Sequence, residues 1–134
     1  MASYPVARVD EIPVGGRKIV EVAGRSIAIF NLDGDFFALR NRCPHQGGPL
    51  CEGFQFSALS SDAPGEYERT RPGQLIRCPW HGWEFDIVTG RSWFDPEGTR
   101  VRRYPVDVRP GEELQAETYP VAVEDAYVVV DLGR

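Results

Sequence analysis

The stretch KIVEVAGRSIAIFNLDGDFFALR, residues 18–40, contains three short apolar runs and two glycine turns. Both turns, Ala23-Gly24 and Asp33-Gly34, place a glycine where the chain can take a positive φ without a Cβ clash, which is typical of tight β-hairpins. The runs are short and rich in β-branched and aromatic residues, as strands are. We therefore expect three consecutive antiparallel strands, at Lys18–Val22, Ser26–Asn31 and Phe36–Arg40.

Similar short apolar runs occur along the rest of the chain, and no window has the repeat of apolar residues that an amphipathic helix needs. The further strands expected are Leu75–Arg77, Glu84–Val88, Val101–Val108, Val121–Glu124 and Tyr127–Leu132, with another turn at Thr89-Gly90. Pro105 has no N–H to donate, so it should lie on an edge or end a strand. The pattern predicts an all-β protein, a compact antiparallel sandwich or barrel.

One long segment departs from this pattern. Small, polar and charged residues predominate between Phe54 and Gly73, where the sequence includes SALSSDAPGEYERTRPG. We expect a long loop here, most simply a tolerated surface insertion, because lengthening a loop adds little closure entropy. In the alternative interpretation the loop covers a functional site or contacts a partner beside it.

Length and charge restrict the class of protein. The 134 residues suit a single domain, and the net charge of −5 argues against a nucleic-acid partner. Most of the acidic excess lies in residues 107–134, which we interpret as a solvated edge. Because the sequence has no apolar run of about 18 residues and no signal-type start, we expect a cytoplasmic protein with no membrane partner.

Two pairs of residues carry the chemistry. The chain has only two histidines, and each follows a cysteine within three residues: His45 follows Cys43, and His81 follows Cys78. Two such pairs in turn-rich segments form a ligand set suited to an iron–sulfur cluster or to zinc. Glycines follow both pairs and would let backbone amides approach a bound group closely, which favours the cluster over a structural zinc module.

The two segments Cys43-Pro-His-Gln-Gly-Gly-Pro-Leu50 and Cys78-Pro-Trp-His-Gly-Trp-Glu-Phe-Asp86 closely resemble the two cluster-binding loops of Rieske [2Fe-2S] proteins. The resemblance is firmest over residues 41–90. It implies a Rieske-type all-β fold with a cluster-binding subdomain of two loops, in a single domain over residues 1–134 with an inserted loop at about 54–73. It also implies one 2Fe-2S cluster, with Cys43 and Cys78 on one iron and His45 and His81 on the other.

The residues around the two boxes indicate which branch of the family the chain resembles. High-potential Rieske proteins carry a further cysteine after each box, joined in a disulfide, together with a serine and a tyrosine that donate hydrogen bonds near the cluster. At those places this sequence has Gly48, Trp80, Trp83 and Phe85. The resemblance therefore implies a low-potential centre, closest to the Rieske-type ferredoxins and oxygenase Rieske domains.

These features together predict an electron carrier without catalytic residues of its own. We expect a ferredoxin that passes electrons from a reductase to an oxygenase or a similar acceptor; the alternative is a small Rieske subunit of a larger oxidoreductase complex. The chain cannot itself be the oxygenase, because the extra iron of that enzyme needs two more histidines and a carboxylate.

Two further expectations concern residues beside the loops. Cys51 is left over from the ligand set, and we expect it to pack as a small apolar residue. The residues flanking the predicted ligands should form a small, mostly apolar docking surface for the redox partner. They are Pro44, Gln46, Pro49, Leu50, Pro79 and Trp80.

Overall fold

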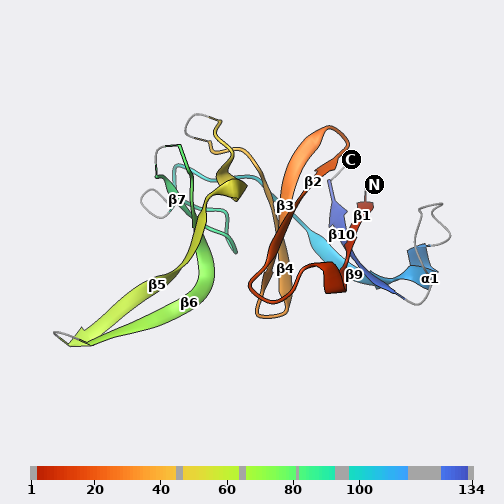
Figure 1. Ribbon diagram of the computed structural model, residues 1–134. Helices are drawn as coiled ribbons and strands as arrows, with labels where there is room; N and C mark the ends of the chain where they lie inside the picture. The colour runs from red at the N-terminus through yellow and green to blue at the C-terminus, as the bar shows by residue number, and fades with distance from the viewer. Residues whose placement is uncertain are drawn as a thin grey trace. The chain divides into compact units, whose positions relative to one another are not determined.

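The computed structural model describes residues 3–44, 47–63, 66–80, 82–92, 97–114 and 125–132 (Figure 1). The regular secondary structure of these residues is almost all strand in antiparallel sheets, which confirms the predicted all-β class. The chain divides into two compact units. One consists of residues 1–38 and 103–134, and the other of residues 39–102, which include both cysteine-containing segments.

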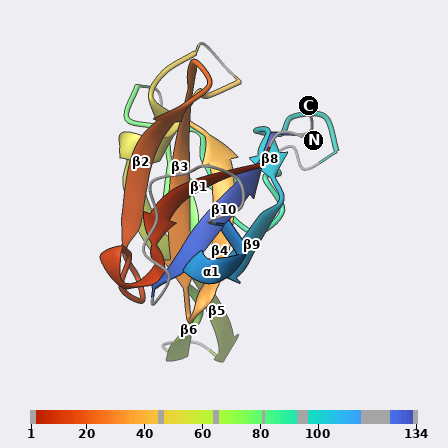
Figure 2. The same cartoon turned by 90° about the vertical axis from the view of Figure 1, so that its right-hand side faces the viewer.

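The first unit contains two sheets. The strands β1 (Ser3–Arg8), β10 (Ala126–Asp131) and β9 (Val106–Pro110) lie side by side in that order (Figure 2). The other sheet has the order β2 (Arg17–Val22), β3 (Arg25–Leu32), β4 (Asp35–Arg40) and β8 (Arg103–Tyr104). The last two residues of β4 lead into the second unit.

The two glycine turns form as the sequence predicts. Ala23 and Gly24 have φ values of 50° and 80°, and Asp33 and Gly34 have 56° and 95°. Positive φ at both central residues defines the type I′ turn that matches the twist of a hairpin. The first turn sets the register in which Val22 lies opposite Arg25 and Ile27 opposite Val20.

Alternate residues of the strands fill the core of the first unit. Buried members of this core include Ile27 and Ile29 from β3 and Val128 and Val130 from β10, each fully inaccessible to solvent. The spacing of two residues within each strand is what places these side chains on one face. The buried Asn31 amide donates to the Ile12 carbonyl at 2.8 Å, so this polar group is satisfied inside the core.

The second unit contains a three-stranded sheet in the order β5 (Phe54–Ala63), β6 (Glu66–Arg77) and β7 (Glu84–Asp86). The expectation of a long loop at Phe54–Gly73 is therefore wrong, because this segment lies in the two strands of a long hairpin. Its backbone hydrogen bonds join β5 to β6 without the alternation of apolar residues by which we recognised the other strands. A two-stranded ribbon needs no buried face to pair its backbone groups.

The remaining strand predictions mostly hold, with differences at the ends. The expected strand Val101–Val108 is divided into β8 and β9 at Pro105, which ends a strand as predicted. The expected strand at Glu84–Val88 ends at Asp86, because the Asp86 carboxylate accepts the Val88 N–H at 2.9 Å and turns the chain. The strand β1 was not predicted, and Val121–Glu124 lies outside the described residues.

Helical structure is minor in the described residues. It comprises the 3-10 turns η1 (Val9–Glu11) and η2 (Leu50–Glu52) and the short helix α1 (Gly111–Leu114). None of these described helices has the length and apolar character needed to cross a bilayer.

Candidate metal centre

The loop after Cys43 is closed by two backbone hydrogen bonds. The Cys43 N–H donates to the Gly48 carbonyl at 2.8 Å, and the Gly47 N–H donates back to the Cys43 carbonyl at 2.7 Å. Gly47 has a φ of 79°, a conformation that residues with a Cβ rarely adopt. The glycine therefore permits the tight return of the chain at this point.

The loop after Cys78 has the same construction. The Cys78 N–H donates to the Trp83 carbonyl at 2.7 Å, and the Gly82 N–H donates to the Cys78 carbonyl at 3.0 Å. Gly82 has a φ of 74°. In both loops the cysteine thus bonds to the residues four and five positions later, and the fourth residue is a glycine in the left-handed conformation. We call Cys43–Gly48 and Cys78–Trp83 the twin loops.

Both cysteines of the twin loops are buried. Cys43 and Cys78 are each 2% exposed, and none of the three cysteines of the chain takes part in a disulfide. His45 and His81, the other predicted ligands, lie outside the described residues. Within the described ranges no three histidine, cysteine or acidic residues gather in a metal site, so the four-residue ligand set stays a prediction.

A close contact joins the twin loops to each other. A Cβ placed on Gly48 would lie 2.7 Å from Cδ2 and 2.8 Å from Cγ of Trp80, so the indole packs directly on the Gly48 backbone. Trp80 is still 56% exposed, as expected for a residue of the docking surface. The second loop therefore covers part of the first with an aromatic ring that also faces solvent.

A second close contact anchors the base of these loops. A Cβ on Gly53 would overlap the Arg77 carbonyl, so only glycine fits between η2 and the end of β6. The Arg77 guanidinium donates to the Glu84 carboxylate at 2.8 and 3.1 Å and ties β6 to β7 on either side of the Cys78 loop. Sequence reasoning missed these three residues; the isolated Gly53 next to a strand was the available signal.

The flanking residues agree only partly with the predicted docking surface. Pro44 and Pro79 are exposed with Trp80, and Pro49 is half-buried. Leu50 is fully buried, so its inclusion in the surface was wrong: it begins η2, which turns its side chain into the core. Gln46 lies outside the described residues.

Cys51 has the structural role that we expected. Its side chain is fully buried, and its Sγ lies 3.6 Å from the Arg40 carbonyl oxygen, within reach of a weak S–H hydrogen bond. Its backbone N–H donates to Asn41 Oδ1 at 2.9 Å. These contacts hold η2 against the end of β4.

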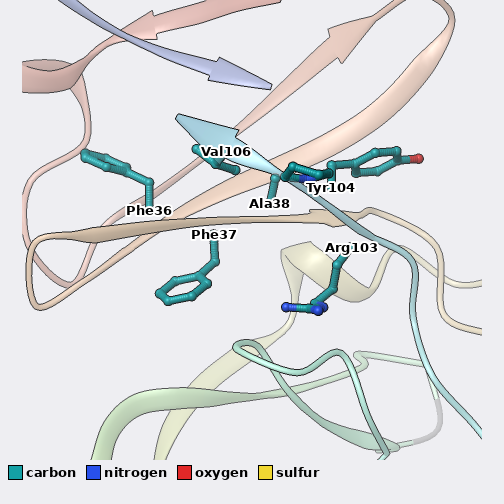
Figure 3. Close-up of a pocket in the computed structure, with 7 residues that line it drawn as sticks. Phe36, Phe37, Ala38, Arg103, Tyr104 and Val106 are labelled. Carbon is teal, nitrogen blue, oxygen red and sulfur yellow. The ribbon is translucent and has the colours of Figure 1, made fainter. Parts of the chain in front are cut away.

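A hollow with a volume of about 460 Å³ lies in the first unit (Figure 3). Figure 3 shows Phe37 and Arg103 on one side of the β4 and β8 backbone, and Phe36, Tyr104 and Val106 on the other. The lining of this hollow contains no cysteine, histidine or carboxylate, so the hollow offers none of the side chains that bind transition metals.

The donor chemistry of the twin loops fits an iron–sulfur cluster. Thiolates are soft ligands that bind iron in such clusters, and each buried thiol here is followed four residues later by a glycine whose positive φ turns the backbone back toward the cysteine. Neither thiol is consumed by a disulfide.

Comparison with known proteins agrees with this geometry. The family model for the Rieske [2Fe-2S] domain matches residues 2–105. A 3-phenylpropionate/cinnamic acid dioxygenase ferredoxin subunit from Photorhabdus laumondii is 32% identical over 111 residues, which are 83% of this chain and 90% of that protein.

Solved structures share the fold. The Sphingomonas yanoikuyae B1 ferredoxin matches with a TM-score of 0.62 and 24% identity, over 97% of this chain and 98% of that one. A chain in a complex of reduced oxygenase and oxidised ferredoxin in carbazole 1,9a-dioxygenase matches with a TM-score of 0.60 and 21% identity, over 94% and 91%. The chain belongs to the Rieske [2Fe-2S] domain family and is an electron carrier of the ferredoxin type that holds a 2Fe-2S cluster.

Proposed function

We propose that this protein carries single electrons from a reductase to the terminal oxygenase of a ring-hydroxylating dioxygenase system. The observation that carries the proposal is the pair of twin loops, in which two buried thiols stand at equivalent places of the same hydrogen-bonded turn. A dioxygenase ferredoxin subunit resembles the chain over 83% of its length.

We propose Cys43 and Cys78 as ligands of one iron and His45 and His81 as ligands of the other. The burial of both thiols supports the first half of this set. The second half rests on the sequence, since the only histidines of the chain follow these two cysteines. When bound, the cluster supplies reversible one-electron chemistry. The chain's own part is to hold the four ligands and limit the access of water.

We propose that the midpoint potential lies at the lower end of the Rieske range, about −150 mV. Phe85 is fully buried and has no hydroxyl, so it cannot donate the hydrogen bond that stabilises a reduced, more negative centre. A redox titration monitored by visible absorption measures this value. A midpoint above about +100 mV would show that other hydrogen-bond donors stabilise the reduced cluster in place of the missing hydroxyl.

We further propose that the redox partner docks over the twin loops, on the surface formed by Pro44, Pro79 and Trp80. All three are exposed, and Trp80 combines a large apolar area with direct contact to both loops. Transient electron-transfer complexes use small interfaces in which one aromatic anchor can supply much of the binding energy.

The test is electron transfer in a reconstituted system of reductase, this protein and a terminal oxygenase. Trp80→Ala should lower the second-order rate constant of transfer to the oxygenase about tenfold, the loss of one moderate anchor. Phe54→Ala is the matched control, because Phe54 is as exposed, at 64%, but is not part of this surface. Equal rates for the two variants would place docking elsewhere, and no transfer by the wild type would refute the proposed function.

We also propose that the protein works in the cytoplasm as a single Rieske domain. Three cysteines outside any disulfide suit a reducing compartment. The match of the family model over residues 2–105 includes segments of both compact units, which supports one domain. Limited proteolysis that releases one folded unit would contradict the single domain.

A further inference from the structure

Two arginines of the second unit lie directly opposite each other. Arg91 and Arg100 form an isolated antiparallel bridge. The backbone hydrogen bonds on either side of this bridge join the residues before and after the two arginines, at 2.9 and 2.7 Å. Arg91 and Arg100 are therefore a non-hydrogen-bonded pair, the kind in which side chains on opposite strands come closest.

A second pair of arginines continues this arrangement. The Arg40 N–H donates to the Arg102 carbonyl at 2.9 Å, so these two residues are also opposite each other. Arg100 and Arg102 are exposed on either side of the buried Val101, which is the alternation of an extended strand. Residues that are directly opposite or two apart share one face. The four arginines thus lie on one face of the second unit, which we call the arginine face.

Most charges of the arginine face are not neutralised within the described part of the chain. All four side chains are exposed. Arg102 has an interaction of its own, but Arg40, Arg91 and Arg100 form no ion pair with any described residue. Like charges directly opposite each other destabilise a strand pair. The arginine face therefore costs stability, which is expected where charged residues serve binding.

Cations at several other places on the described surface do have a carboxylate beside them. Arg77 lies 2.8 Å from Glu84, and three further pairs have N–O distances of 2.9 to 3.1 Å: Arg8 with Asp10, Lys18 with Glu11, and Arg109 with Asp107. The arginine face differs from these places because it gathers like charges without such partners.

Arg42 connects the arginine face with the first twin loop. It is exposed, and its N–H donates to the Arg40 carbonyl at 2.8 Å. A Cβ on Gly47 would lie 3.2 Å from Arg42 Cζ, so the guanidinium lies against the Cys43 loop. The next residue of that loop, Gly48, packs under Trp80 of the proposed docking surface. Basic residues therefore lie next to the surface where the partner is proposed to dock.

We propose that the arginine face binds a carboxylate-rich surface of the protein redox partner and orients that partner over the twin loops. This inference rests on the proposed electron-carrier function. Guanidinium groups bind carboxylates through parallel N–H donors, and a positive surface attracts an acidic one over about 8 Å at physiological salt. A nucleic acid suits this chain less well as the occupant, because the net charge of −5 repels phosphates.

The test is the salt dependence of electron transfer from the reduced protein to the terminal oxygenase, followed by stopped flow. Transfer by the wild type should slow as the salt concentration rises. Arg91→Gln combined with Arg100→Gln should lower the association rate constant about tenfold at low salt and flatten its salt dependence. Arg17→Gln combined with Arg25→Gln is the matched control and should change the rate little. It removes the same charge from the first unit, at arginines that also form no ion pair with a described residue.

Arg91→Glu separates binding from a structural role. It places a carboxylate opposite Arg100, so it should raise the urea midpoint of unfolding while it slows electron transfer. A purely structural arginine would change stability and transfer in the same direction. Unchanged visible absorption and midpoint potential check that each variant carries its cluster.

Three results would overturn the inference. The first is equal slowing of transfer by the two double variants, and the second is a wild-type rate that does not depend on salt. The third is a wild-type rate in the Arg91 and Arg100 double variant together with loss of binding to a DNA duplex, which would assign the face to a nucleic acid. Absence of transfer by the wild type in every condition would instead refute the proposed function.

Discussion

The loop after Cys43 and the loop after Cys78 are closed by the same two hydrogen bonds, but their surroundings differ. A Cβ on the left-handed Gly47 of the first loop would lie 3.2 Å from the flexible Arg42 side chain, and the next residue, Gly48, lies under the Trp80 ring. In the second loop a Cβ on Gly82 would lie 4.0 Å from Arg77 Cδ, at ordinary van der Waals distance. The first loop needs Gly48 because a Cβ there would clash with Trp80. Both loops also need a glycine with positive φ, Gly47 in the first and Gly82 in the second.

This difference separates two physical requirements that look alike in the sequence. A glycine with positive φ is needed wherever the backbone must turn back on its cysteine. A glycine such as Gly48, with an ordinary φ, is needed because another side chain occupies the place of its Cβ. The twin loops are therefore equivalent in their backbone but not in how they contact each other.

The largest expected effect is loss of the cluster when a ligand of either loop is removed. His45→Ala and His81→Ala should each abolish the normal iron–sulfur absorption, because we propose that each loop supplies one cysteine and one histidine ligand. Iron and sulfide analysis of the purified variants measures this.

Cys51→Ser is the control for ligand loss. The Cys51 side chain is buried, and its Sγ lies within reach of a weak hydrogen bond to the Arg40 carbonyl, so its serine variant should keep full iron content. Normal cluster in either histidine variant, or loss of cluster in the serine variant, would contradict the equivalence of the two loops.

A smaller effect is expected from glycine substitutions. Gly48→Ala should lower the free energy of unfolding by about 1–3 kcal/mol, the usual cost of forcing extra atoms into a packed site. Gly82→Ala should cost about 1–2 kcal/mol through backbone strain alone. Urea denaturation of the loaded proteins measures both.

Trp80→Ala provides the double-mutant cycle that distinguishes the two causes. It should remove most of the cost of Gly48→Ala, because the obstructing ring is gone, and none of the cost of Gly82→Ala. Additive energies in the Gly48 cycle would show that the indole does not restrict the first loop.

Much of this arrangement could be predicted from the sequence, for identifiable reasons. Hairpins at Ala23-Gly24 and Asp33-Gly34 were predictable because turn chemistry is local. The two cysteine segments were recognisable because metal ligation fixes both residue type and spacing. Pro105 was correctly expected to end a strand because its missing N–H acts through the backbone alone.

What escaped prediction depends on contacts between distant residues. The hairpin of β5 and β6 has no apolar alternation along its outer part, so its polar sequence suggested a loop. The contact of Gly48 with Trp80 joins positions 32 residues apart and leaves no mark in either loop's own sequence. Leu50 was placed on the surface because its neighbours are there, although η2 buries it.

The smallest expected effect is the loss of stability when an ion pair in the first unit is removed, and it should leave the twin loops unchanged. The Lys18 ammonium donates to the Glu11 carboxylate at 2.9 Å, and this hydrogen bond lowers the pKa of Glu11 from its usual 4.5. A lowered pKa adds stability above the unfolded-state value, and this contribution is lost as the pH falls through the folded-state value. Lys18→Met should therefore cost less than about 1 kcal/mol at pH 7, since the pair is partly exposed.

Denaturation of wild type and Lys18→Met as a function of pH checks this sign. The difference in unfolding free energy should shrink as the pH falls below 4.5 and Glu11 becomes protonated in both proteins. A difference that stays constant into the acid range would show that Lys18 acts through packing instead. The visible spectrum of the cluster at pH 7 should be the same in both.

The most direct test of the equivalence of the twin loops is to identify the ligands of each iron. Mössbauer spectroscopy of wild-type protein grown on ⁵⁷Fe should show two inequivalent irons in equal amounts, one bound by the thiolates of Cys43 and Cys78 and one by the imidazoles of His45 and His81. On reduction, the added electron should localise on the imidazole-bound iron. Two equivalent irons, or stoichiometric zinc without labile sulfide, would contradict the account.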